Sequence, residues 1–267
     1  MTIVADHRFF QNVGFGSVHK TLEAIVWHIE EVDHLYRQAD WNNDKAPDRI
    51  GVSLDKVIIF TDAASPGNAF KDETTDDEVF LKRFAGVNTT GSCVAAVFTF
   101  SDLGGTFGIS YVGTVCAPKY NWALINFRNV DGEIRQRAAS VITIMHEVAH
   151  VFGANHDENE TRCLPAGQNN GADNGGNYIM YPTSAFGLYE NNHRFSPCSV
   201  ESIAKNFQDA KRTRCMIDRS PTAAPSRRRR ATKRDVFRYS VRQNKPLKMG
   251  VWSQMVKANE IFAYSKT

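Results

Sequence analysis

Hydrophobic residues recur at three- and four-residue steps in two long stretches of the chain. In residues 18–36 they are Leu22, Ile25, Val26, Ile29, Val32 and Leu35, and in residues 141–152 they are Val141, Ile144, Met145, Val148, Val151 and Phe152. Because an α-helix turns about 100° per residue, this spacing gathers the apolar side chains on one face of a helix. Both stretches are therefore predicted to be amphipathic helices. We expect the histidines of the first, His19, His28 and His34, to lie at the surface.

Shorter apolar runs lie before, between and after these two helices. The runs at residues 2–5, 56–60, 93–100 and 121–127 predict strands, and the glycine-bracketed stretch 104–113 predicts another. Residues 77–84 are predicted to form a short helix. The alternation of strands with helices predicts an α/β fold built around one sheet.

The second predicted helix carries His146 and His150 one turn apart, on the side opposite its apolar face. A single histidine in such a run is more often a hydrogen-bonded core residue, but Gly153 follows and lets the chain turn sharply. That turn can bring His156 back towards the other two. Three neutral imidazoles leave a tetrahedral Zn²⁺ ion one open position for water, which is typical of a catalytic zinc site. Glu147 lies beside them and is suited to proton transfer.

The pattern H-E-x-x-H-x-x-G-x-x-H in residues 146–156 resembles the zinc motif of the metzincin metalloproteases, and Asp157 after it resembles the adamalysin or ADAM branch. A bare H-E-x-x-H arises by chance in roughly one per cent of chains of this length; the complete pattern does not. The resemblance implies a metzincin-like α/β catalytic domain with a twisted, mostly parallel sheet, an active-site helix and a Met-turn. It also implies one catalytic zinc ion held by His146, His150 and His156, with Glu147 as the catalytic residue.

Other motifs extend the resemblance along the chain. Met180, 24 residues after His156 in the run Tyr-Ile-Met-Tyr-Pro, resembles the Met-turn methionine beneath the zinc ligands. Residues 104–113 resemble the edge strand that binds substrate in ADAM proteases, which implies main-chain hydrogen bonds from Phe107 and Gly108. Residues 177–198 resemble the subgroup of tumour necrosis factor-α converting enzyme and Kuzbanian. That subgroup implies a primed-side substrate pocket formed by Thr143, Thr183, Ser184 and Ala185.

The chain contains five cysteines, and several connectivities are compatible with the sequence alone. The subgroup's pattern implies the pairs Cys116–Cys215 and Cys163–Cys198. It leaves Cys93 unpaired, because relatives pair the equivalent cysteine with one that precedes the first strand. We therefore expect Cys93 to carry a free thiol, with a redox or cysteine-switch role as the alternative. Cysteines together with glycosylation sequons at Asn88 and Asn159 favour an extracellular setting.

Charge is distributed unevenly along the chain. Residues 219–267 hold 13 of the 32 Lys and Arg residues but 2 of the 29 acids, so this segment carries about +11 and residues 1–218 about −8. We expect a catalytic domain in residues 1–218 and a basic, disordered tail in residues 219–267. The basic run at residues 227–230 has three interpretations: a disordered linker, a furin-type cleavage site after Arg230, or nuclear targeting or nucleic-acid binding, which the lack of interleaved aromatic residues disfavours.

No apolar run approaches the ~18 residues of a membrane span, and no secretory leader follows Met1. We therefore expect a fragment or a truncated product without a prodomain. The predicted function is zinc-dependent endopeptidase action on extracellular or membrane-anchored proteins, as in ectodomain shedding. The alternatives are an inactive zinc-binding or adhesion module, and a secreted toxin-like or matrix-degrading protease. We expect a protein or peptide substrate, no nucleic-acid partner, no membrane span within the chain, and a monomer that is secreted or lies at the cell surface.

Overall fold

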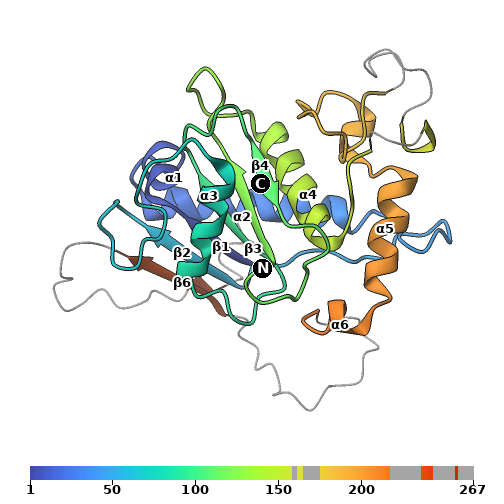
Figure 1. Cartoon of the computed structure of the whole chain (residues 1–267), viewed down its shortest axis with the longest axis horizontal. Helices are drawn as coiled ribbons and strands as arrows, with labels where there is room; N and C mark the ends of the chain where they lie inside the picture. Colours follow the sequence, from blue (N-terminus) through green and yellow to red (C-terminus); the bar gives the residue numbers. More distant parts are fainter. Residues whose placement is uncertain (158–160, 165–174, 217–235, 243–255, 258–267) are drawn as a thin grey trace.

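A computed structural model describes residues 1–157, 161–164, 175–216, 236–242 and 256–257 (Figure 1). Its described strands form one sheet in the order β4-β5-β3-β1-β2-β6-β7. The strands are β1 Thr2–Ala5, β2 Lys56–Phe60, β3 Ala95–Thr99, β4 Gly108–Ser110, β5 Trp122–Asn126, β6 Val236–Arg242 and β7 Val256–Lys257.

Most of the strand pairs are parallel. The strands β1, β2, β3, β5 and β6 pair in parallel with their neighbours, whereas β4 is antiparallel to β5 and β7 is antiparallel to β6. The predicted α/β fold with a mostly parallel sheet is confirmed. Strand β4 forms one edge of the sheet, and this edge borders the candidate site.

The helices are α1 His7–Asn12, α2 Val18–Tyr36, α3 Asp77–Lys82, α4 Arg137–Phe152, α5 Pro197–Phe207 and α6 Ala210–Thr213. Helices α1, α2 and α4 pack on one face of the sheet and α3 on the other, whereas α5 packs on α4 and α6 on α5. Short 3₁₀ turns cover Arg83–Gly86, Thr161–Cys163 and Glu190–His193. The predicted bounds of α2 and β2 are confirmed. Helix α4 begins at Arg137, four residues before the predicted start at Val141.

Side chains alternate between two hydrophobic cores along the central strands. On β1, Ile3 and Ala5 join the core shared with α1, α2, α4 and α5, whereas Val4 joins the core shared with α3. Because successive side chains on a strand point to opposite faces, burial of both faces requires nearly every residue to be apolar. This requirement explains why these strands appear in the sequence as continuous apolar runs.

The predicted basic tail contains described strands as well as undescribed residues. Strand β6 pairs in parallel with β2, and β7 pairs with β6. The basic run at residues 227–230 and the sequon at Asn159 lie outside the described residues. The division at residue 218 and the disorder of the tail stay predictions. Within the part of the chain that is described, no helix is both long and apolar enough to cross a membrane.

The prediction that His28 lies at the surface is wrong. His28 is 4% exposed, its Nδ1 donates to the carbonyl of Ala24 at 2.7 Å, and its ring lies edge-on to Phe127 with 5.1 Å between centroids. The helical period already placed it on the apolar face, three residues after Ile25. Burial lowers the pKa of His28 to about 4, and the bond to Ala24 offsets part of that shift.

We expect His28 to make the fold sensitive to acid. Its pKa is about 4 in the folded chain and about 6.5 in the unfolded chain, so between these values the unfolded state binds more protons and stability falls as pH falls. At pH 5 the loss relative to pH 7 is about 2 kcal/mol. Urea unfolding of the wild type and of His28→Gln at pH 7 and pH 5 measures this loss of unfolding free energy. Equal losses in the two proteins would show that His28 contributes nothing to this sensitivity.

Candidate active site

Helix α4 carries three of the predicted site residues and ends where the sequence indicated. Gly153 has φ of 109°, and its N–H donates to the carbonyl of His150 at 2.8 Å. Asn206 of α5 donates to the carbonyl of Phe152 at 2.8 Å and occupies the space where a side chain on residue 153 would lie. A glycine is therefore required here both for its backbone conformation and for the close approach of α5.

The position of α4 is fixed by backbone contacts from distant segments. The N–H groups of Gly113 and Val115, in the loop after β4, donate to the carbonyls of His150 and Val151 at 2.8 and 3.0 Å. On the opposite side, the buried hydroxyl of Tyr36 donates to the carbonyl of Met145 at 2.8 Å. The last carbonyls of a helix lack partners within the helix, so the bonds from Gly113 and Val115 tie the end of α4 to the loop after β4, while the Tyr36 bond ties its middle to α2.

The three predicted imidazole ligands converge. The Nε2 atoms of His146, His150 and His156 lie 3.0 to 3.1 Å from one another. The Nδ1 atoms of His146 and His150 lie 2.7 Å from the carbonyl oxygens of Ile179 and Ala154. A carbonyl accepts only, so each Nδ1 carries the proton and each opposing Nε2 presents a lone pair. Burial lowers the pKa of His146 to about 3 and of His150 to about 4, which keeps both rings neutral.

These residues fit a zinc ion. Zn–N bonds of 2.0–2.1 Å in a tetrahedral arrangement place ligand nitrogens roughly 3.3 Å apart, close to the separations observed here. Lone pairs directed at one another at this distance repel unless a cation lies between them. Zinc-bound histidines usually donate the N–H of their other ring nitrogen to a carbonyl or carboxylate oxygen, as His146 and His150 do here. The three imidazoles could therefore bind a metal ion and leave one coordination position open.

Glu147 lies beside the imidazoles in a buried environment. It is 4% exposed, and the hydroxyl of Ser110 in β4 lies 2.7 Å from its Oε2, to which it donates. Burial raises the pKa of Glu147 to about 8, and the Ser110 bond acts in the opposite direction. A cation held by the neighbouring imidazoles would favour the ionised carboxylate. The side chain is therefore poised to exchange a proton near neutral pH.

The residues of β4 allow this edge strand to lie close to the side chain of Glu147. Gly108 and Ser110 are two residues apart, so their side-chain positions share one face of the strand. That face meets Glu147: a Cβ on Gly108 would lie 2.7 Å from the Cγ and Cδ of Glu147. The missing side chain at Gly108 leaves room for the carboxylate, and Ser110 supplies its hydrogen bond.

The main chain of β4 offers fewer contacts to a peptide than expected. The carbonyl of Phe107 accepts from the N–H of Asn126 at 2.8 Å, within the sheet. In an antiparallel pair, successive residues direct their N–H and C=O groups to opposite sides. The main-chain groups of Gly108 and Ser110 therefore face the outer edge. The carbonyl of Phe107 is already used within the sheet, and the substrate contact at Gly108 stays a prediction.

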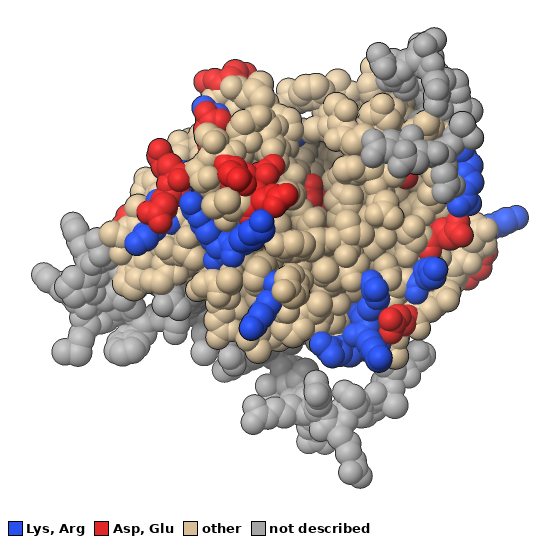
Figure 2. All heavy atoms as spheres, viewed as in Figure 1, with Lys and Arg blue, Asp and Glu red and all other residues tan. Residues whose placement is uncertain are grey.

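A cleft of about 1050 Å³ contains the candidate site. The three imidazoles and Glu147 line it, as do the predicted substrate residues Phe107, Gly108, Thr143, Thr183, Ser184 and Ala185. Figure 2 shows the surface hollowed in the region where Figure 1 places β4 and α4. The structure thus brings together residues from β4, α4 and the segment after Met180.

Met180 does not line the cleft but lies in the core beneath it. It is fully buried, and its carbonyl accepts from the N–H of Asp157 at 2.9 Å. The Oδ1 of Asp157 in turn accepts from the hydroxyls of Ser196 and Ser199 at 2.6 and 3.1 Å. Asp157, which directly follows His156, therefore connects the third imidazole to Met180 and to the start of α5.

Two residues of the site were missed in the sequence. Ser110 could have been found from strand alternation, because a glycine and a serine two residues apart on an edge strand share one face. Arg135 lies between β5 and α4, is 7% exposed, and has its guanidinium carbon 3.6 Å from the Phe107 ring centroid. Its loop shows no periodic pattern, so nothing in the sequence indicated its burial.

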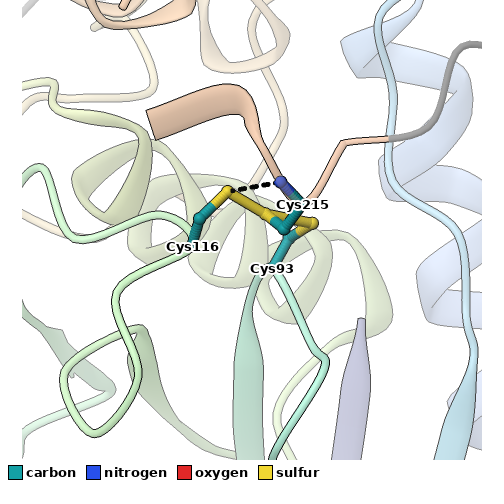
Figure 3. A group of neighbouring side chains, drawn as sticks. All are labelled: Cys93, Cys116 and Cys215. Carbon is teal, nitrogen blue, oxygen red and sulfur yellow. Dashed lines mark hydrogen bonds between the residues drawn. A yellow bond between two sulfur atoms is a disulfide. The ribbon is translucent and has the colours of Figure 1, made fainter. Parts of the chain in front are cut away.

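Three cysteines from separate segments lie together: Cys93 before β3, Cys116 between β4 and β5, and Cys215 after α6. Cys215 is within disulfide range of both Cys93 and Cys116, with Cα–Cα distances of 5.4 and 5.5 Å (Figure 3). One sulfur atom forms one disulfide, so the two pairs exclude each other. The predicted Cys116–Cys215 pair with a Cys93 thiol is one of these two arrangements. Cys163 and Cys198 form a separate disulfide, with Cα atoms 5.4 Å apart.

We expect the Cys116–Cys215 pair to dominate. The segment that carries Cys215 is hydrogen-bonded to the Cys116 loop: the N–H of Cys215 lies 3.2 Å from the Cys116 sulfur, and Arg214 donates to the Cys116 carbonyl at 3.0 Å. Peptide mapping without reduction should find Cys116–Cys215 and an alkylated Cys93. Cys93→Ser should then keep the wild-type melting temperature, whereas Cys215→Ser should lose about 2–5 kcal/mol of stability. Recovery of a Cys93–Cys215 peptide as the main product would contradict this pairing.

Comparison with known proteins gives a family match over most of the chain. The metallo-peptidase family M12B, reprolysin-like, matches residues 18–209. This range includes every residue of the candidate site.

Curated relatives agree with that match. The chain is 29% identical over 237 residues to disintegrin and metalloproteinase domain-containing protein 10 of Homo sapiens, covering 81% of this chain and 31% of the relative. It is 28% identical over 239 residues to the Caenorhabditis elegans homolog of that protein, covering 75% of this chain and 25% of the homolog. The chain thus spans less than a third of the length of these relatives. A solved structure titled "Structure of a chaperone-substrate complex" is similar over 79% of this chain and 34% of its own, at a TM-score of 0.45 and 16% identity, too slight a likeness to bear on the fold.

Proposed function

The chain belongs to the reprolysin-like M12B metallopeptidases and is a zinc metalloendopeptidase, and we propose that it cuts extracellular or membrane-anchored proteins, as in ectodomain shedding. The observation that carries the proposal is the convergence of three imidazole Nε2 atoms within 3.1 Å of one another in a cleft that also holds Glu147. An open edge strand beside this cleft suits an extended peptide.

We assign roles to the chain's own residues as follows. His146, His150 and His156 hold one zinc ion, which when bound supplies Lewis-acid activation of water and of the scissile carbonyl. The Ser110 hydroxyl fixes Oε2 of Glu147, so that the carboxylate can take a proton from the attacking water and deliver it to the leaving amine. Met180 supports the ligands from below as a Met-turn methionine.

The substrate would bind as an added strand along β4. The outward main-chain groups of Gly108 and Ser110 would pair with the peptide backbone, as in other cases of strand addition. Side chains on the primed side would enter the part of the cleft lined by Thr143, Thr183, Ser184 and Ala185. A secreted or cell-surface location is consistent with the Cys163–Cys198 disulfide and with an exposed Asn88. Monomeric state and lack of nucleic-acid binding stay predictions.

The proposed function is tested with a quenched-fluorescent peptide library and the full chain. We expect hydrolysis to require zinc, to stop when the ion is removed by a chelator, and to return when zinc is added back. Zinc content is measured on the same samples. Stoichiometric zinc without cleavage of any peptide would contradict the proposal and indicate a zinc-binding module that is not catalytic.

A second assay tests whether the chain releases ectodomains from membrane-anchored proteins. Membrane-anchored reporter proteins with tagged ectodomains are displayed on cells and exposed to the purified chain. Release of the tag by the wild type, and not by the zinc-depleted chain, would support shedding. Cleavage of soluble matrix proteins without release of any reporter would instead favour a matrix-degrading protease.

A further inference from the structure

Arg135 is a buried cation without an acidic partner in the part of the chain that is described. It is 7% exposed, and burial lowers the pKa of Arg135 to about 10. Its Nη1 is buried and has no hydrogen-bond partner among the described residues. Burying a guanidinium group without a carboxylate is costly, so the contacts that Arg135 does make require an explanation.

Those contacts join two segments of the chain that both line the cleft. The guanidinium carbon lies 3.6 Å from the centroid of the Phe107 ring, just before β4, and Nη2 donates to the hydroxyl of Ser184 at 2.8 Å. Phe107 and Ser184 both line the cleft, and they lie on opposite sides of α4 in the sequence. The planar guanidinium group therefore stacks on Phe107 and hydrogen-bonds to Ser184 at the same time. Arginine provides this geometry and lysine does not.

The backbone around Arg135 is itself fixed to the sheet. Its N–H donates to the carbonyl of Phe127 at 2.9 Å, and the preceding residue Ile134 forms a bridge with Arg128. Arg135 thus extends from an anchored position at the end of β5. Ser184 is exposed, in contrast to the buried Arg135, and the guanidinium group connects it to Phe107.

We infer that Arg135 is a positioning residue that sets the distance between Phe107 and Ser184, and with it the substrate side chains that the cleft accepts. This inference rests on the proposed function, because it assumes that these two residues contact the substrate. Arg135 touches no reacting atom and lies outside the zinc ligands. Its loss should therefore alter substrate preference and KM while zinc content and kcat change little.

The test compares Arg135→Met with Arg137→Met as a matched control. Arg137 also lies over an aromatic ring, with its guanidinium carbon 5.1 Å from the Trp27 ring centroid, but Trp27 does not line the cleft, whereas Phe107 does. For Arg135→Met we expect a broader primed-side preference in the peptide library and a KM about tenfold higher for the best peptide. Arg137→Met should match the wild type, and Arg135→Lys should recover only part of the loss.

A double-mutant cycle with Ser184→Ala separates positioning from general stability. If Arg135 acts through Ser184, the effects on KM of Arg135→Met and Ser184→Ala should not add. Thermal unfolding of each variant checks the fold. An unchanged preference in folded Arg135→Met, or an equal change in Arg137→Met, would overturn the inference.

Failure of the proposed function can be distinguished from failure of the inference about Arg135. If the zinc-loaded wild type cleaves no peptide, the proposed function fails. The preference for peptide side chains is then measured by fluorescence anisotropy of labelled peptides binding to the same variants. A binding preference that differs between the wild type and Arg135→Met, but not Arg137→Met, would still support the role of Arg135. Identical binding preferences would overturn it.

Discussion

Replacing Glu147 by glutamine is expected to lower kcat about a thousandfold while zinc stays bound, because general acid–base catalysis contributes 10²- to 10⁴-fold. The amide has the shape of the carboxylate and can still accept from the Ser110 hydroxyl, which donates to Oε2 at 2.7 Å in the wild type. None of the imidazole Nε2 atoms is altered. Steady-state hydrolysis of the best library peptide and zinc content by mass spectrometry measure the two expectations.

The matched control is Glu133→Gln, an exposed acid in the loop before α4 that does not line the cleft. It should keep wild-type kcat. Full activity of zinc-loaded Glu147→Gln would rule out proton transfer by this residue. Loss of zinc together with activity would show instead that Glu147 organises the metal site.

The second large effect is expected from a single methyl group at Gly108. A Cβ there would lie 2.7 Å from the Cγ and Cδ of Glu147 and would also overlap Oε1. Glu147 is buried on a helix that is tied at both faces, so either its side chain or β4 must move. A misplacement of about 1 Å can cost 10²-fold in rate. We therefore expect Gly108→Ala to lower kcat/KM by about a hundredfold with zinc retained.

Gly86→Ala is the control for this substitution. Gly86 has no positive φ, and a Cβ there would meet Ala69 at 3.2 Å, away from the cleft. We expect this variant to keep wild-type kcat/KM. Wild-type activity in folded Gly108→Ala would mean that β4 yields without disturbing Glu147, and the geometry at Gly108 would not matter for catalysis.

Most of the fold and the convergence of the three histidines could be predicted, because local rules govern them. Spacing of apolar residues defined α2, and the glycine after α4 defined the turn that brings His156 back. Helix α4 starts earlier than expected because residues 137–140 contain no large apolar residue, although Ala139 and Ser140 are buried. Periodicity detects a helix by its apolar stripe, so a first turn built from small residues is overlooked.

The residues that were missed depend on contacts between distant segments. His28 was assigned to the surface because histidine is polar, although its position in the helical period placed it among Ile25 and Ile29. Arg135 reaches Phe107 and Ser184, which are 28 residues before and 49 residues after it in the chain. No local pattern encodes such a bridge. The choice between Cys93 and Cys116 as partner of Cys215 has the same origin, because it depends on how three segments meet.

The bond from Nδ1 of His146 to the carbonyl of Ile179, at 2.7 Å, spans 33 residues of the chain. Helix α4 alone therefore would not define the affinity of the proposed zinc site, since the ring of His146, its first proposed ligand, is oriented by a segment that joins the fold from elsewhere. Release of that segment frees His146 while the helix is still intact. On gradual denaturation, the ion should consequently dissociate before the far-ultraviolet circular dichroism of the helices is lost, which makes metal release an early reporter of unfolding.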